Sequence, residues 1–383
     1  MMETEILTES RRDEIDAFFE ACPESFAQQT TAWRDVIAPI GPDEPIFLGC
    51  RDGGRLVGVL PAYRFAGPMG AILTSVPQPG ALGGVAALPG ADRESVYSAL
   101  VEALLKVARD RDCSLATVIE NPFRPDRALY DRTLEPDFVL ENRTLVLDLD
   151  DDVGPSGTCL HASENLRRNL RKALSGETVI DDTQTSENVD AWYAIHAGRH
   201  GRIGAAPLPR ALFTNALHFM VPRDKARFFF VRLASTGEMI GGGFYLFHGR
   251  VIDAFMTALR DEHARLAPNH LLGAHTIAWA KRRGLRFYNW EPSPPSGGVD
   301  RFKRQWGSRD MAYHYLTRIT GDAEALLRST PEEISRSYPR HYVLPFDRIG
   351  AAGSAARAAS TRAAAWNALA APEPGDRGGK GAS

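Results

Sequence analysis

The sequence predicts a mixed α/β fold built from two similar parts. Short apolar runs rich in β-branched and aromatic residues alternate with an amphipathic helical run in each half of the 383-residue chain, which is typical of α/β proteins. The order of elements then recurs: residues 54–58 correspond to 237–241, and the helical run 99–111 corresponds to 274–283. We interpret this as an internal duplication; chance similarity between two generic α/β units is the alternative.

The first half carries clear local signals for its elements. Its expected elements are a helix at 11–22, strands at 46–50, 55–65, 114–119 and 143–149, and a helix at 92–112. Gly53 and Gly54 mark the turn of a hairpin between the first two strands. Asp92 is the expected N-cap of the long helix, because its carboxylate can accept a hydrogen bond from a free N–H group of the first turn.

The second half is expected to repeat that order after a basic linking helix. Its expected elements are a joining segment at 160–175 that contains the linking helix, strands at 227–233, 239–247, 250–258 and 285–290, and a helix at 269–283. The predicted division is a first domain at 1–156, the linking helix with the second domain at 157–320, a C-terminal extension at 321–349, and an Ala/Gly-rich, partly disordered tail at 350–383.

Charge is distributed unevenly along the chain. The formal net charge is −3, but residues 1–156 hold 14 basic and 27 acidic side chains, while residues 157–383 hold 31 and 21. The second part is therefore the expected place for a phosphate-rich ligand, with mutual attraction of two oppositely charged surfaces as the alternative.

Composition narrows the class of protein. The chain is 44% hydrophobic and 24% charged, as is usual for globular proteins. No apolar run is long enough for a transmembrane helix, and the acidic start does not resemble a signal sequence, so a cytoplasmic location is expected. The four cysteines are too scattered for a disulfide framework or a cysteine zinc site: Cys22, Cys50, Cys113 and Cys159.

The first candidate site is the start of the helix at 269–283. Pro268 suits a first helical turn because it has no N–H group to leave unpaired, and the free N–H groups behind it can bind an anion. Arg265, Asn269 and His270 would add to such a phosphate site. An ordinary helix start without a ligand is the alternative, and the segment lacks the glycines of a phosphate loop.

The second candidate site follows the strand at 285–290. A loop rich in proline and glycine begins at Glu291 and ends in a basic cluster of Arg301, Lys303 and Arg304. Loops at strand ends are where α/β folds place their sites, and these cations can bind phosphate or stabilise an oxyanion. A merely solvated cluster is the alternative.

The third candidate site is the linking helix, for which Ser163 is the expected N-cap. Four cations crowd within little more than one of its turns: Arg167, Arg168, Arg171 and Lys172. With the other basic runs of this half they can line a groove for a phosphate backbone, whereas a solvated helix face is the alternative.

Metal and covalent chemistry have little support in the sequence. His196 and His200 have the spacing of a metal-binding pair on one helix face, but the glutamate of H-E-x-x-H and a third ligand are missing, so we expect no metal. A G-x-S-x-G nucleophile elbow is also missing.

Several of these segments together resemble FemAB-type acyltransferases. The resemblance is carried by residues 267–272, 279–284, 287–290 and 302–307, and by the Pro-rich loop 77–84 of the first half. Members of this family consist of tandem GNAT domains. The resemblance therefore implies two GNAT-like domains, each with a mixed central sheet flanked by helices.

The resemblance also implies a reaction, in which an activated acyl group is transferred to an amine to give an amide. The leading donor is an aminoacyl-tRNA, and the alternative is a thioester of CoA or of an acyl carrier protein. The acceptor would be an amine of a small molecule or peptide, as in specialised metabolism, with no bound cofactor. A non-catalytic module that only binds a nucleotide-linked ligand is the third interpretation.

Three residues receive roles from this resemblance and from their positions. Lys303 matches the family's lysine in the run 302–307 and would contact phosphate or the acyl carbonyl. Glu291 would be the base or the anchor of the amine, because it follows a strand end that should face the cleft. Asp253 is the second choice for the base. For both acids the alternative is a structural role, in which the carboxylate caps a turn.

Overall fold

The computed structural model describes residues 2–41, 44–75, 82–124, 126–154, 157–202, 204, 206–292, 297–339 and 343. The strands are β1 (Glu3–Leu7), β2 (Glu44–Asp52), β3 (Arg55–Gly67), β4 (Gly70–Thr74), β5 (Ala86–Ala87), β6 (Cys113–Ile119), β7 (Phe138–Asp148), β8 (Thr178–Asp181), β9 (Ala226–Leu233), β10 (Met239–His248), β11 (Val251–Leu259), β12 (Phe287–Asn289) and β13 (Arg309–Ile319). The α-helices are α1 (Arg12–Glu20), α2 (Thr31–Ile37), α3 (Arg93–Asp110), α4 (Arg127–Thr133), α5 (Glu164–Ala173), α6 (Ser186–Arg202), α7 (Arg210–Phe219), α8 (Pro268–Arg282), α9 (Gly298–Arg304), α10 (Glu324–Arg328) and α11 (Pro331–Ser337), and the 3₁₀ turns are η1 (Glu9–Arg11), η2 (Ala27–Gln29) and η3 (Asp261–Leu266).

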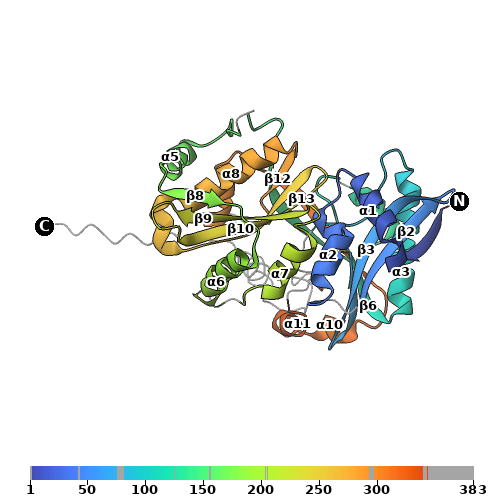
Figure 1. Ribbon diagram of the computed structural model, residues 1–383. Coiled ribbons are helices and arrows are strands. Elements are labelled where there is room, and N and C mark those ends of the chain that lie inside the picture. Colours follow the sequence, from blue (N-terminus) through green and yellow to red (C-terminus); the bar gives the residue numbers. More distant parts are fainter. Residues whose placement is uncertain are drawn as a thin grey trace.

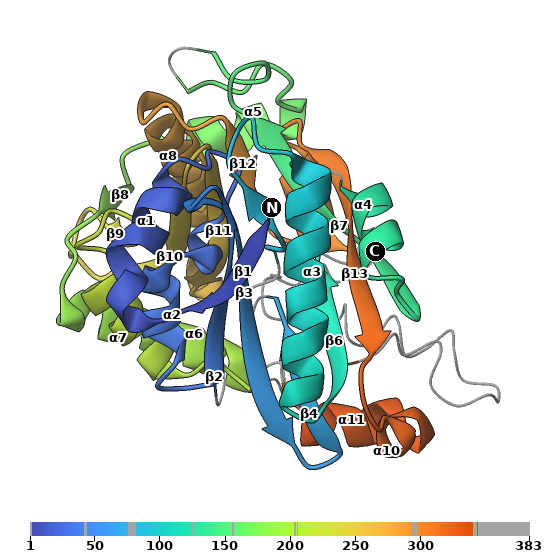
Figure 2. The same ribbon diagram turned by 90° about the vertical axis from the view of Figure 1, so that its right-hand side faces the viewer.

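One continuous sheet runs through both halves of the molecule (Figures 1 and 2). Its strand order is β1-β2-β3-β4-β6-β13-β7-β12-β11-β10-β9-β8, and β5 pairs with β3. Two neighbouring pairs are parallel, namely β4 with β6 and β11 with β12. In each case a long helix, α3 or α8, lies between the two strands in sequence, as parallel neighbours require.

The two parts of the sheet repeat one arrangement. Strands β1, β2, β3, β4 and β6 of the first part correspond in order to β8, β9, β10, β11 and β12 of the second, and α3 corresponds to α8. This repetition confirms the mixed α/β fold in two similar parts that the sequence predicts.

Strands β7 and β13 join the two parts. β7 follows the first part in sequence but pairs with β12, whereas β13 follows the second part but pairs with β6. The two strands also pair with each other along most of their length. The last strand of each part of the sheet therefore comes from the other half of the chain: β13 completes the first part and β7 completes the second. The division of the chain into domains between residues 156 and 157 stays a prediction.

Local chemistry explains where individual elements begin and turn. The side chain of Asp92 accepts a hydrogen bond from Ser95 N at 3.4 Å and caps α3, and Ser163 caps α5 in the same way. Both are the expected caps. Gly53 and Gly54 have φ values of 54° and 82°, in the left-handed region that the tight turn between β2 and β3 requires.

Helices cover both faces of the sheet. In the second half, α5 and α8 cover one face, while α6, α7 and also α2 of the first half cover the other (Figure 1). Trp33 of α2 is fully buried there and packs edge-on against Phe255 of β11. This shared core holds the two halves against each other.

The start of the C-terminal extension packs on the first half. Tyr338, directly after α11, is buried with Ile72 of β4 and Leu115 of β6, and its hydroxyl donates to Gly70 O at 2.8 Å. Most of the loop 77–84 and the tail 350–383 lie outside the described residues. None of the described helices has the length and apolar character that crossing a membrane requires.

Candidate active site

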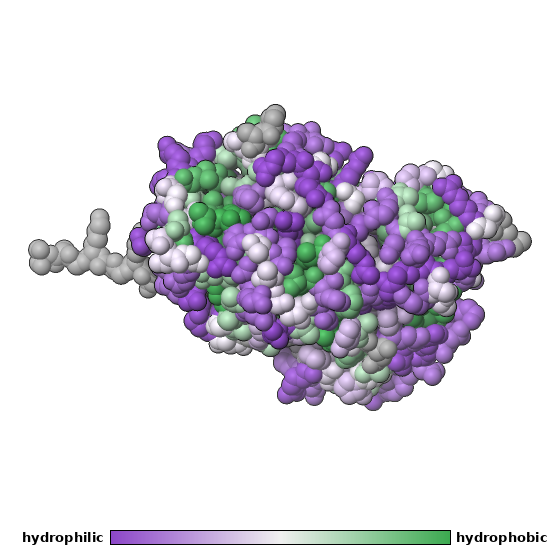
Figure 3. All heavy atoms as spheres, in the orientation of Figure 1, coloured by the Kyte–Doolittle hydropathy of each residue, from purple (hydrophilic) through white to green (hydrophobic). Residues whose placement is uncertain are grey.

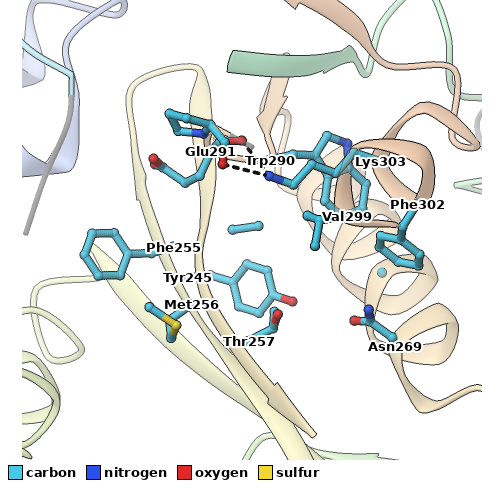
Figure 4. Close-up of a pocket in the computed structure, with 13 residues that line it drawn as sticks. Tyr245, Phe255, Met256, Thr257, Asn269, Trp290, Glu291, Val299, Phe302 and Lys303 are labelled. Carbon is cyan, nitrogen blue, oxygen red and sulfur yellow. Dashed lines mark hydrogen bonds between the residues drawn. The ribbon is translucent and has the colours of Figure 1, made fainter. Parts of the chain in front are cut away.

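A small pocket of about 60 Å³ opens where β12 ends (Figure 4). β10 and β11 form one wall and α8 and α9 the other. The pocket is lined by Tyr245, Ala254, Phe255, Met256, Thr257, Asn269, Gly273, Trp290, Glu291, Pro292, Val299, Phe302 and Lys303. Three of the residues singled out from the sequence, Asn269, Glu291 and Lys303, are thus brought together.

The pocket exists because two parallel strands separate. β11 pairs with β12 only as far as Asp253, opposite Asn289, although β11 itself continues to Leu259. Residues 254–257 therefore line the pocket along an edge that β12 leaves uncovered. Such an edge offers peptide N–H and C=O groups that can bind an extended ligand or a developing oxyanion.

The chain turns sharply directly after β12. Glu291 has a φ of 63°, in the left-handed region that residues other than glycine rarely adopt. Glu291 N donates to Asn289 Oδ1 at 3.2 Å, and Lys303 Nζ donates to the carbonyl oxygens of Glu291 and Pro292 at 2.7 and 3.2 Å. These bonds hold a strained conformation of the kind that clusters at functional sites. Figure 4 shows the Glu291 carboxyl group on the side of Phe255, away from Lys303.

A buried acidic network lies beside the pocket. Asn289 Nδ2 donates to Asp253 Oδ1 at 2.7 Å and lies 3.4 Å from Glu291 Oε1. The other oxygen of Asp253 accepts a hydrogen bond from Gln28 Nε2 at 3.1 Å. The Thr144 hydroxyl donates to Asn289 Oδ1, which orients the amide so that its nitrogen faces the two acids.

Burial changes the proton affinity of the three titratable groups. Desolvation raises the pKa of Asp253 to about 6. Desolvation, and then the charge of Asp253, raises the pKa of Glu291 well above its ordinary value. Desolvation lowers the pKa of Lys303 to about 7, although Glu291 favours its charged form. The two acids therefore retain a proton that exposed carboxyl groups would release, and a carboxylate with a pKa near neutrality is suited to general base catalysis.

The start of α8 lies at the edge of the pocket. Among the described residues no side chain caps this helix, and Pro268 is its first residue, as expected. Asn269 lines the pocket, and Arg265 is exposed in the preceding turn. His270 packs edge-on against Phe302, and burial lowers the pKa of its imidazole to about 4. It would thus enter a phosphate site as a neutral group.

The cations of α9 differ in their surroundings. Arg304 pairs with Asp300 at 2.9 Å and with Asp310 at 2.8 Å, so two carboxylates already offset the charge that we expected to bind phosphate. Arg301 is exposed. Lys303 is buried and, of the three, is the one that lines the pocket.

The basic helix α5 packs on α8, outside the pocket. Asn169 of α5 contacts the His270 ring at 3.3 Å, and Asn165 donates to Gln305 Oε1 at 3.0 Å. The four cations of this helix are exposed: Arg167, Arg168, Arg171 and Lys172. Within the part of the chain that the structure describes, no carboxylate forms an ion pair with them. α5 therefore presents positive charge beside the pocket.

The histidine pair of α6 lies on the opposite face of the sheet from α8. The rings of His196 and His200 are 4.1 Å apart. His196 Nε2 accepts a hydrogen bond from Leu208 N at 3.2 Å, and His200 Nδ1 lies 2.8 Å from His196 O. These contacts give both rings a structural role in the core.

Three members of the acidic network were missed from the sequence. Asn289 follows an apolar strand run and directly precedes Trp290-Glu291, which was a weak signal. Gln28 and Thr144 carry no local signal, because they reach the site only through η2 and β7.

Comparisons with known proteins place both halves in one superfamily. Residues 161–304 match a family described as "Acetyltransferase (GNAT) domain", and residues 7–134 match "Acetyltransferase (GNAT) family". A comparison with curated proteins found no match.

Three solved structures illustrate the shared fold. FemX superposes with a TM-score of 0.67 at 14% identity, covering 82% of this chain and 97% of its own. A tandem GNAT protein from the clavulanic acid biosynthesis pathway has a TM-score of 0.52 at 14% identity, with 85% and 100% covered. The C-terminal domain of a putative lysylphosphatidylglycerol synthetase from Agrobacterium fabrum has a TM-score of 0.54 at 10% identity, with 84% and 95% covered. With a GNAT match in each half, this protein is an acyltransferase of two tandem GNAT domains, with the FemAB-like fold that its sequence predicts.

Proposed function

We propose that this acyltransferase forms an amide by moving an aminoacyl group from aminoacyl-tRNA to a primary amine of a small molecule or peptide. The observation that carries the proposal is the buried pair of Asp253 and Glu291 beside the pocket. A primary amine is protonated at neutral pH and must lose a proton before it can attack a carbonyl carbon. Two acids with raised pKa values are suited to receive that proton.

The reaction can be followed bond by bond. The acid pair takes a proton from the ammonium group, and the neutral nitrogen attacks the ester carbonyl, forming the C–N bond. The oxyanion of the tetrahedral intermediate would be stabilised by peptide N–H groups of the uncovered edge at 254–257. The attacking nitrogen then loses a second proton. When the intermediate collapses, the ester C–O bond breaks and the ribose oxygen takes up that proton, while the proton held by the acid pair passes to solvent. Because the ester is already activated, orienting the amine contributes much of the rate.

The basic helix α5 supports a tRNA donor. Its exposed cations lie next to α8 and can neutralise backbone phosphates. Figure 3 shows hydrophilic residues beside hydrophobic residues in the region of α5 and β8, and Leu174, directly after α5, is 65% exposed. The exposed cations are the feature of this surface that can contact the backbone of a nucleic acid.

A thioester donor is the second candidate, and the start of α8 favours it. This helix begins at the pocket without a side-chain cap, and such a helix start can bind the phosphates of CoA or of a phosphopantetheine arm.

A transfer assay with two donors tests both candidates. The protein is incubated with either labelled aminoacyl-tRNA or labelled acetyl-CoA, with glycinamide as the amine, before and after RNase treatment of the donor. We expect labelled amide from the tRNA donor that RNase abolishes. RNase-resistant product from acetyl-CoA would replace the tRNA proposal by the thioester candidate. If neither donor yields labelled amide, the proposed reaction is refuted.

A further inference from the structure

We infer that Gln28, contributed by the first half of the chain, binds the amine of the acceptor together with Asp253. The inference rests on the proposed function, because it names the residue that receives the nucleophile of that reaction. Gln28 lies in η2, and its side chain crosses to the second half, where Nε2 donates to Asp253 Oδ2 at 3.1 Å.

The side-chain oxygen of Gln28 is the main evidence. Gln28 is fully buried, and its Oε1 atom has no hydrogen-bond partner among the described residues. Buried polar side-chain atoms are nearly always paired, and an unpaired carbonyl oxygen costs stability. Among the described residues no group donates a hydrogen bond to this oxygen, and a ligand can supply one.

The orientation of the Gln28 amide follows from its neighbours. Asp253 Oδ1 is already occupied by Asn289 Nδ2, which is itself oriented by Thr144. If the Gln28 amide were flipped, two oxygens would face each other across 3.1 Å. The nitrogen therefore faces the carboxylate and leaves Oε1 available.

Charge indicates which ligand group fits. The site contains two buried acids, Asp253 and Glu291, while the nearby cation Lys303 is engaged with two main-chain carbonyl oxygens. A primary ammonium group brings a positive charge and three N–H donors, so it can bond to Gln28 Oε1 and to the neighbouring Asp253 carboxylate at once. An alcohol brings one donor and no charge, so the site selects an amine over the corresponding alcohol.

The segment that carries Gln28 is fixed to both halves. Phe26 N donates to Gln29 Oε1 at 3.0 Å, and Gln29 Nε2 donates to Gly84 O at 2.9 Å in the first half. Arg250 N of the second half donates to Pro23 O at 2.9 Å. Gln28 is thus held in place before a ligand arrives, which lowers the cost of binding.

The test compares Gln28→Met, which keeps the shape and removes the oxygen, with Gln28→Glu, which keeps an oxygen acceptor. Glycinamide is the amine probe and glycolamide is the matched alcohol. Thermal unfolding measures probe binding without a donor, and initial rates measure the KM for glycinamide. Tyr338→Phe, which removes a buried hydroxyl on the far side of the first half, controls for general destabilisation.

We expect glycinamide, but not glycolamide, to stabilise the wild type. Loss of a hydrogen bond to a charged group should raise the KM for glycinamide in Gln28→Met about 10-fold or more, with a smaller change in kcat and partial recovery in Gln28→Glu. An unchanged KM, or equal binding of both probes by the wild type, overturns the inference and leaves the transferase proposal standing. If no donor yields amide but Gln28→Met still loses the stabilisation by glycinamide, the inference holds and the proposed reaction fails. Wild-type protein that binds neither probe also overturns the inference.

Discussion

Replacing Asp253 by asparagine is expected to remove a pH dependence of stability that this buried acid creates. The pKa of Asp253 rises from 3.8 to about 6 on folding, whereas the unfolded chain keeps the lower value. At 1.36 kcal/mol for each pKa unit, this rise corresponds to about 3 kcal/mol. Because folding favours the protonated form of Asp253, the free energy of unfolding decreases as the pH rises. The contribution is fully present below pH 3.8 and is lost as the pH rises through the folded pKa.

The variant keeps most of the surrounding contacts. Its amide oxygen can accept from Asn289, and Gln28 can turn its own amide so that its oxygen accepts from the new NH₂ group. Urea unfolding of both proteins at pH values on either side of the folded pKa measures the effect. The free energy of unfolding of the variant should improve relative to wild type by most of the ~3 kcal/mol as the pH rises. A difference that stays constant within about 0.5 kcal/mol, as for an ordinary surface substitution, would refute the assignment of a raised pKa to Asp253.

Three further changes test the site. Glu291→Gln should lower kcat about 10²- to 10⁴-fold, the usual contribution of a general base, and initial rates of the variant and of the wild type measure this loss. Equal rates would exclude Glu291 as part of the base. Lys303→Met removes both hydrogen bonds that hold the turn after β12, so kcat/KM should fall about 10-fold or more; a wild-type value in the transfer assay would contradict this. Changing Arg167, Arg168 and Arg171 together to alanine should weaken tRNA binding and reduce the salt slope by about 2 to 3, and filter binding across a salt series with an unchanged slope would remove α5 from the donor site.

Turns and helix caps could be predicted from the sequence, because they depend on residues that are neighbours in the chain. The glycine turn at Gly53 and the cap at Asp92 depend on neighbouring residues, and both appear where expected. The position of β13 could not be predicted in this way. Thr317 of β13 shares a hydrogen bond with Thr117 of β6, 200 residues earlier, and a pairing over that distance leaves no periodic pattern near either strand.

The site shows the same contrast. Glu291 was found because a strand end next to a proline is a local signal, and Lys303 was found through the family's run of residues. The charged pattern of α9 nevertheless suggested a solvated or phosphate-facing lysine, whereas the turn at Glu291 places two carbonyl oxygens over its Nζ atom and buries it. The contact between Gln28 and Asp253 spans 225 residues, so only the assembled fold reveals it.

The two copies of the fold differ at the places where a donor and an acceptor would bind. The second turn of α8 contains Gly273, where an added Cβ would lie 2.7 Å from the ring of Trp306, and the start of the helix is uncapped. The first copy instead closes the start of α3 with the carboxylate of Asp92, which repels phosphate, and places buried Tyr97 in the second turn. Under the proposed function an anionic donor would therefore bind at the second copy, while the first copy extends Gln28 to Asp253 of its neighbour. A hydrogen bond between copies requires them to be fixed to a fraction of an ångström, and the exchange of β7 and β13 within one sheet supplies a rigidity that a flexible linker between separate domains would not.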